Sequence, residues 1–133
     1  MANTQSARDQ IVTAVTAWPG VHAAPGDRGE LTFTVGRRQL GHLHGQRVAH
    51  FSFPKQVWAE LREQGRIVPH PVFPDAQGPA ARSMESEADV REVIALFRLN
   101  YDRAVARRGV PDALRGQAST ARALGGTARK GSS

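Results

Sequence analysis

The feature that most constrains the fold is an alternating segment followed closely by two glycine-led chain reversals. In ELTFTV, residues 30–35, apolar side chains alternate with threonines, which is typical of a β-strand with one buried face. The pairs Gly36-Arg37 and Gly45-Gln46 each suit a two-residue hairpin turn, because glycine adopts a positive φ at the first central position without strain. Residues 31–53 are therefore predicted to form an antiparallel meander of short strands.

Two-residue turns would decide which way the histidines of this meander point. They would pair His42 with Leu31 on one side and with Ala49 on the other, and directly paired residues share a face. His50 would then lie on the opposite face. The predicted core face comprises Leu31, Phe33, Val35, Leu40, His42, His44, Ala49, Phe51 and Phe53. A three-residue second loop would bring all three histidines to one face, but it would require Arg47 to adopt the left-handed conformation that such loops usually give to glycine.

Apolar residues at helical spacing predict three helices around the meander. The first spans about residues 4–17 and ends at Trp-Pro-Gly, and the second runs from Pro54 to Gly65. The third and longest begins at a capping-box-like Ser86-x-x-Asp89. The four prolines of residues 66–84 leave room only for one or two short edge strands, around Val72 and residues 81–84. The predicted fold class is α+β, with a short antiparallel meander sheet and the helices mainly on the face that carries His42.

The net charge of +6 arises entirely at the C-terminal end. Residues 1–102 contain 11 basic and 11 acidic side chains, whereas residues 103–133 contain seven basic residues and the single acid Asp112. The latter segment has no aromatic residue and no sustained apolar period, so it is predicted to be disordered beyond about residue 108. We therefore expect a folded domain at 1–108 and a basic tail at 109–133, which serves solubility rather than as a nucleic-acid arm because its arginines are dispersed.

The remaining composition narrows the class of protein. A chain of 133 residues suits one domain, and the absence of cysteine excludes a disulfide framework and a thiolate metal site. The N-terminus lacks the pattern of a signal peptide, and no apolar run approaches the ~18 residues of a membrane span. No P-loop, GxGxxG, GxSxG or HExxH motif is present. We expect a cytoplasmic protein without membrane contact, either a monomer or a weak dimer.

Several motifs resemble those of bacterial and fungal proteins of the luciferase-domain family. They are WPGV at 18–21, VGRRQLGHLHG at 35–45, FP at 53–54, ELREQG at 60–65, FPD at 73–75 and DVREVIALFRLNYDRA at 89–104. The resemblance covers about residues 8–105 and implies neither light emission nor a known substrate. The order of elements also resembles the small YjbR-like α+β domains, a fold that has been linked to DNA binding, but only at the level of the fold.

The resemblance identifies a set of signature positions: Gly41, His42, His44, Gly45, Asp75, Asn100 and Tyr101. This chain departs from the family pattern in two places. His50 stands where an acidic residue is common, and Ala76-Gln77-Gly78-Pro79 follows Asp75 where a Gly-Trp pair is common. If that Trp walls a pocket in relatives, the site of this protein is reshaped or lost.

The His42-x-His44 pair admits three interpretations. Its imidazoles are core side chains with satisfied nitrogens, polar and acid–base anchors for a small molecule, or ligands of a metal ion whose third ligand comes from Asp75 or His70. The interpretation adopted for function is a small-molecule site in a pocket between the sheet and the helices, anchored by His42 and His44. The alternative is a nucleic-acid-associated module that makes weak, non-specific contacts through the tail.

The candidate residues follow from these interpretations. The catalytic candidates are His42, His44, Asp75 and Tyr101, and the ligand-binding candidates are Gly41, Gly45, Arg38 and Arg47. No residue is assigned to a metal and no cofactor is named. Whether the protein is an enzyme is left open.

Overall fold

The structure is a computed structural model, which describes residues 5–108 of the chain. The elements are α1 (Ala7–Thr16), β1 (Val21–Pro25), β2 (Leu31–Val35), β3 (Arg38–His44), β4 (Val48–Ser52), α2 (Lys55–Glu63), β5 (Val68–Pro69), β6 (Pro79–Ser83) and α3 (Glu87–Arg108). The strands form one antiparallel sheet in the order β1-β2-β3-β4-β6-β5. The fold class is α+β, as predicted.

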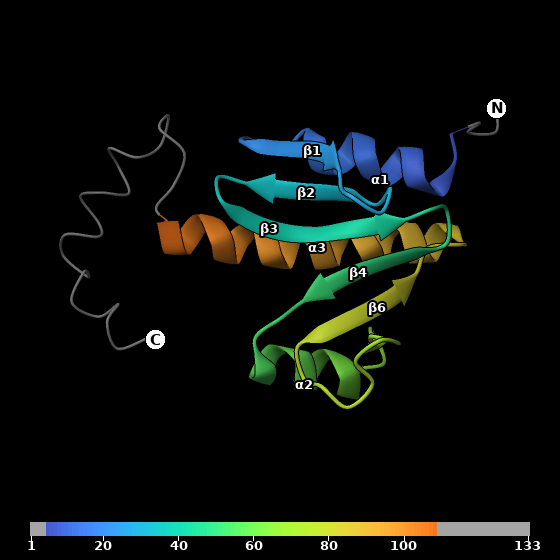
Figure 1. Ribbon diagram of the computed structural model, residues 1–133, viewed down its shortest axis with the longest axis vertical. Helices are drawn as coiled ribbons and strands as arrows, with labels where there is room; N and C mark the ends of the chain where they lie inside the picture. Colours follow the sequence, from blue (N-terminus) through green and yellow to red (C-terminus); the bar gives the residue numbers. More distant parts are fainter. Residues whose placement is uncertain (1–4, 109–133) are drawn as a thin grey trace.

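Helices α1 and α3 cover one face of this sheet, and α2 lies beyond the β6 end of it (Figure 1). Ile11 and Val15 of α1 are completely buried, as are Val93 and Phe97 of α3. The Phe97 ring packs edge-on against Phe33 of β2 and Phe51 of β4, with centroid distances of 4.9 and 4.8 Å. The core therefore lies between the sheet and α1 and α3, and the other face of the sheet carries neither of these helices.

The helix ends follow the local sequence. The Ser6 hydroxyl accepts the Asp9 N–H at 3.0 Å and begins α1. At α3 the predicted capping box forms, since the Ser86 hydroxyl accepts the Asp89 N–H at 3.0 Å and the Asp89 carboxylate accepts the Ser86 N–H at 3.2 Å. The three predicted helices are confirmed with slightly shorter bounds.

The strand predictions outside the meander are only partly correct. The meander was predicted to begin at residue 31, but residues 21–25 form a further strand, β1, which pairs with β2. The segment around Val72 is a turn rather than a strand, and the short strand lies earlier, at Val68–Pro69. The strand near residues 81–84 exists as β6, but it lies between β4 and β5 and is not an edge strand. The expected tail at 109–133 lies outside the described residues.

The first hairpin has the predicted turn but not the predicted register. Gly36 adopts φ +61°, and Val35 pairs with Arg38 as expected. A β-bulge follows, in which Thr34 pairs with Gln39 but Phe33 pairs with Gly41, so Leu40 is the extra residue. Leu40 is 1% exposed, and a Cβ built on Gly41 would lie 2.9 Å from Cε1 of Phe97, so both positions face the helices. The bulge therefore turns His42 to the opposite face.

The second hairpin has a three-residue loop, residues 45–47, instead of the predicted two-residue loop. His44 pairs with Val48, and His42 pairs with His50. A three-residue loop was expected to require a left-handed backbone at Arg47. Instead Gly45 takes that conformation, at φ +61°, and no described non-glycine residue has a positive φ. The loop that would gather the three histidines is therefore the one that forms.

The prediction that His42 and His44 point toward the helices is wrong. Leu43, which lies between them, is fully buried, and it pairs with Ala49 on the core face. His42 and His44 therefore share the open face with His50, and no histidine-anchored pocket lies between the sheet and α1 and α3.

Candidate functional site: a histidine cluster on the open face of the sheet

Four imidazoles gather on the open face where β3 and β4 pair. The ring centroids of His42 and His44 lie 4.8 Å apart, and those rings lie 5.3 and 4.5 Å from the ring of His50. His70, from the segment after β5, places its ring 4.1 Å from that of His50. Strand alternation supplies the first pair, cross-strand pairing supplies His50, and a connecting segment supplies His70.

One nitrogen atom from each of His42, His44 and His50 lies within 4.8 Å of the other two. His50 is 8% exposed, and its Nδ1 atom is buried with no hydrogen-bond partner among the described residues. A buried polar atom without a partner is unfavourable by about 1–3 kcal/mol, so it indicates a missing interaction partner. The three histidines are therefore a candidate ligand set for a cation.

The His70 ring has a defined orientation at the rim of this cluster. Its Nδ1 accepts the Val72 N–H at 3.1 Å, so in the neutral ring the proton resides on Nε2. The ring also lies 5.4 Å from the exposed ring of Phe73. Nε2 is therefore the nitrogen that His70 offers to a ligand.

The environment lowers the pKa of three of these imidazoles, those of His42, His50 and His70, and so favours their neutral form. Burial and, after it, the neighbouring His70, His44 and His42 in that order together lower the pKa of His50 to about 4. Burial is also the main cause of the lowered pKa of His42, and there the nearby Glu30 carboxylate acts in the opposite direction. The pKa of His70 is lowered by burial and by His44. Neutral imidazole is the form that binds metal ions.

A small pocket adjoins the cluster. It has a volume of about 190 Å³, and His42, His50 and His70 line it together with Phe73 and residues of β3 and β4. The cluster thus opens onto a cavity with apolar walls and several imidazole edges.

Two predicted catalytic residues are not brought to the histidines. Tyr101 lies buried on α3, on the helical side of the sheet, where its hydroxyl donates to the Pro19 carbonyl at 2.7 Å and its ring packs on Trp18. Burial raises the pKa of Tyr101. Asp75 is exposed beyond Phe73 and does not belong to the described cluster of ligand atoms. The sheet therefore separates Tyr101 from His44.

The predicted ligand-binding glycines and Arg47 occupy other positions. Gly41 allows close packing of the sheet under Phe97, and Gly45 forms the hairpin turn with open space around it. Arg47 is exposed in that turn, and its carbonyl accepts the Met84 N–H at 2.9 Å. Gly45 and Arg47 lie at one end of β3, and Arg38 lies at the other. One small molecule cannot contact both arginines along a strand of seven residues, about 20 Å long.

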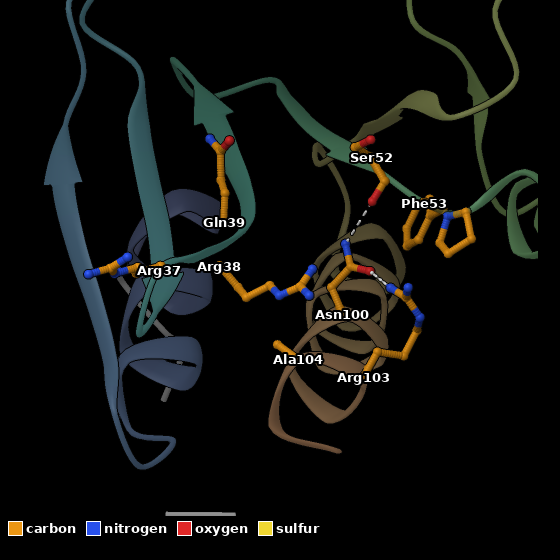
Figure 2. A pocket seen from close by; sticks show the side chains of 9 residues that line it. Arg37, Arg38, Gln39, Ser52, Phe53, Asn100, Arg103 and Ala104 are labelled. Atoms are coloured by element: carbon orange, nitrogen blue, oxygen red, sulfur yellow. Dashed lines mark hydrogen bonds between the residues drawn. The ribbon is translucent and has the colours of Figure 1, made fainter. Parts of the chain in front are cut away.

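Arg38 instead lines a larger cavity between the sheet and α3. This cavity has a volume of about 480 Å³ and is lined by Arg37, Arg38, Gln39, Ser52, Phe53, Pro54, Asn100, Arg103 and Ala104. Figure 2 shows Arg38 extending from β3 toward Asn100 and Arg103 on α3, whereas Arg37 points away from them. Sequence reasoning selected only Arg38 as a ligand-binding residue here, although the family resemblance had marked Asn100.

The part of the chain that carries this geometry matches a known family model. Residues 37–100 match the family model described as the Luciferase domain, and this range spans β3, the histidine cluster and Asn100 of α3. No curated protein and no solved structure shows significant similarity to the chain. The fold-level resemblance to YjbR-like domains stays a prediction. Among the described residues no helix has the length and apolarity to cross a membrane. The match shows that residues 37–100 of the chain carry a Luciferase domain.

Proposed function

We propose that this luciferase-domain protein binds a divalent transition-metal ion through His42, His44 and His50 and uses it to bind a small molecule. The observation that carries the proposal is the convergence of three histidine nitrogens within 4.8 Å, one of which is held by a buried ring with an unpartnered Nδ1. The proposed small-molecule site is the one expected from the sequence, except that it lies on the open face of the sheet rather than between the sheet and the helices.

The spacing of the nitrogens supports a metal ion of ordinary size. Imidazole nitrogens bound at ~2.0–2.1 Å to a tetrahedral ion lie roughly 3.3 Å apart, so separations up to 4.8 Å close by modest side-chain rotation. Nitrogen ligands without thiolates suit zinc, iron and copper. The lowered pKa values of His42 and His50 favour binding, because few protons need to be displaced at neutral pH.

The surroundings support small-molecule binding at the ion. Three protein ligands leave a coordination position open, as in catalytic zinc sites. The adjoining pocket of about 190 Å³ gives a small molecule an apolar contact with Phe73. His70 can serve as a fourth ligand or as a hydrogen-bond donor to the bound molecule through Nε2.

Metal titration of the full chain tests the proposal. We expect one Zn²⁺ or Co²⁺ ion per chain with micromolar or tighter affinity, roughly −8 kcal/mol or better, measured by calorimetry and by the visible absorption of bound Co²⁺. The variants His42→Gln, His44→Gln and His50→Gln should each weaken binding at least about tenfold while circular dichroism stays unchanged.

His22→Gln is the matched control, because His22 is exposed on β1 and lies outside the cluster. This variant should bind the metal as the wild type does. A wild type that binds neither ion, or cluster variants that bind as tightly as His22→Gln, would overturn the proposal. A thermal-shift screen of small molecules with and without Zn²⁺ then tests whether ligand binding depends on the ion.

The nucleic-acid alternative is not favoured. It depends on the basic tail, which lies outside the described residues, whereas the family match lies within residues 37–100. A cytoplasmic location and a monomeric or weakly dimeric state remain part of the proposal.

A further inference from the structure

The cavity between the sheet and α3 has the chemistry of an anion site. Its volume of about 480 Å³ falls within the range of small-molecule sites. Arg37, Arg38 and Arg103 line it, and no carboxylate of the described residues does. Within residues 5–108 neither Arg37 nor Arg38 forms an ion pair.

The cavity exists because β3 and β4 separate at this end of the sheet. Their pairing runs from His44 and Val48 only to His42 and His50. Beyond that point the Asn100 side chain of α3 reaches between the strands, and its Nδ2 donates to the carbonyls of Leu40 at 3.0 Å and Ser52 at 3.2 Å. These bonds replace the missing cross-strand bonds and hold the strands apart (Figure 2).

The same amide orients one of the arginines. Asn100 is 6% exposed, and with both carbonyls bound to its Nδ2 its Oδ1 is fixed toward the cavity. That oxygen accepts the Nη1–H of Arg103 at 3.0 Å. Arg103 is therefore held by a buried group, while Arg38 approaches from β3 (Figure 2). Two guanidinium groups on separate elements converge here, and Arg38 forms no ion pair within residues 5–108, which favours an anion beside it.

We propose that this cavity binds the oxyanion group, a carboxylate or a phosphate, of a small-molecule ligand. Arg38 and Arg103 supply the charge-assisted hydrogen bonds, and Asn100 is a positioning residue that acts through Arg103. Planar guanidinium groups match the oxygens of either anion in a bidentate manner.

The anion site adjoins the pocket at the histidines, because the two cavities share lining residues. Gln39 and Ser52 line both cavities, so a molecule held by its anionic end at the arginines can extend past these two side chains toward His42 and His50. This step rests on the proposed metal function. It defines the ligand class as an elongated small molecule with an oxyanion at one end and a metal-binding group at the other.

Calorimetry on the metal-free full chain at low salt tests the anion site separately from the metal site. The probes are inorganic phosphate, phenyl phosphate and benzoate, and comparing their affinities distinguishes a phosphate site from a carboxylate site. We expect saturable binding of at least one probe with a millimolar or tighter Kd, and losses of about tenfold in Arg38→Ala and Arg103→Ala. Arg38→Lys should bind the probe less tightly than wild type, because lysine keeps the charge but lacks the paired N–H donors of a planar guanidinium.

Arg62→Ala is the matched control, since Arg62 is exposed on α2 and does not line the cavity. Loss of binding in this variant equal to that in Arg38→Ala would show a diffuse charge effect and overturn the proposal, as would no saturable binding of any probe up to about 10 mM. Arg38→Ala should still bind Co²⁺ with an unchanged absorption spectrum. Failure of the anion site is therefore distinguishable from failure of the metal site.

Discussion

At the scale of single residues, Gly41 decides which face of β3 carries the histidines. The sequence identified His42 and His44 as candidates but placed them on the wrong face, because alternation from Phe33 assumes an unbroken ladder. Gly41 ends the bulge with φ +152° in contact with α3 and with β4. A side chain there would lie 2.8 Å from the His50 carbonyl and 2.9 Å from the Phe97 ring. Sequence periodicity does not predict such a contact, because the contact joins residues of β3, β4 and α3.

Gly41→Ala should therefore destabilise the fold by about 2–3 kcal/mol through the backbone contact and the unfavourable φ. The control Gly29→Ala has φ +83° but nothing within 4 Å, and it should be unfavourable by only about 1 kcal/mol. Urea unfolding followed by tryptophan fluorescence measures both. Equal losses in the two variants would contradict the close packing of β3 beneath Phe97.

At the scale of elements, sequence features that act within a few residues predicted the local structure correctly. The capping box at Ser86, the turn at Gly36 and the three helices were all predicted. The register of β3 was not, because the bulge at Leu40 and the extra loop residue at Arg47 each shift the pairing by one position. The two shifts cancel on β4, so Ala49 and Phe51 were placed on the core face correctly. The predicted core faces of β2 and β4 therefore agreed with each other even though the predicted face of His42 and His44 was wrong.

The junction of β6 and α3 gives a prediction at this scale. The Asp89 carboxylate pairs with Arg82 of β6 at 2.9 Å and accepts the N–H groups of Glu85 and Ser86. Burial opposes ionisation there, but these hydrogen bonds and Arg82 lower the pKa of Asp89 overall. Asp89→Ala should be destabilising by about 2 kcal/mol, whereas Asp102→Ala, which breaks an exposed pair with Arg98, should change stability by less than about 0.5 kcal/mol. Thermal unfolding compares them, and a larger loss in Asp102→Ala would argue against this junction.

At the scale of the whole molecule, helices α1 and α3 cover one face of the sheet and the imidazoles gather on the other (Figure 1). Sequence patterns predicted the two layers, because burial of apolar stripes drives them. They did not predict the site, since His50 and His70 reach it by cross-strand pairing and through a proline-rich connection. The fold thus holds the histidines on a rigid sheet but outside the apolar core, where a ligand can reach them.

This arrangement makes the stability of the metal-free protein depend on pH. His50 faces His42, His44 and His70, with Glu30 close to His42 and His44, and its pKa of about 4 lies below the 6.5 of the unfolded chain. The unfolded state therefore binds more protons between these values, so the free energy of unfolding falls as pH drops from 6.5 to 4. His50 alone accounts for roughly 3 kcal/mol, and the lowered pKa values of His42 and His70 act in the same direction.

Urea unfolding of the metal-free protein at pH 7 and at pH 4.5 measures this loss. His50→Gln should reduce it, whereas His22→Gln should leave it unchanged, because His22 is exposed on β1 away from the cluster. Saturation with Zn²⁺ should raise stability most at pH 7, because protons compete with the metal for the same nitrogens as the pH falls. A metal-free protein with equal stability at both pH values would show that His50 is not held neutral, and would remove the electrostatic basis of the site.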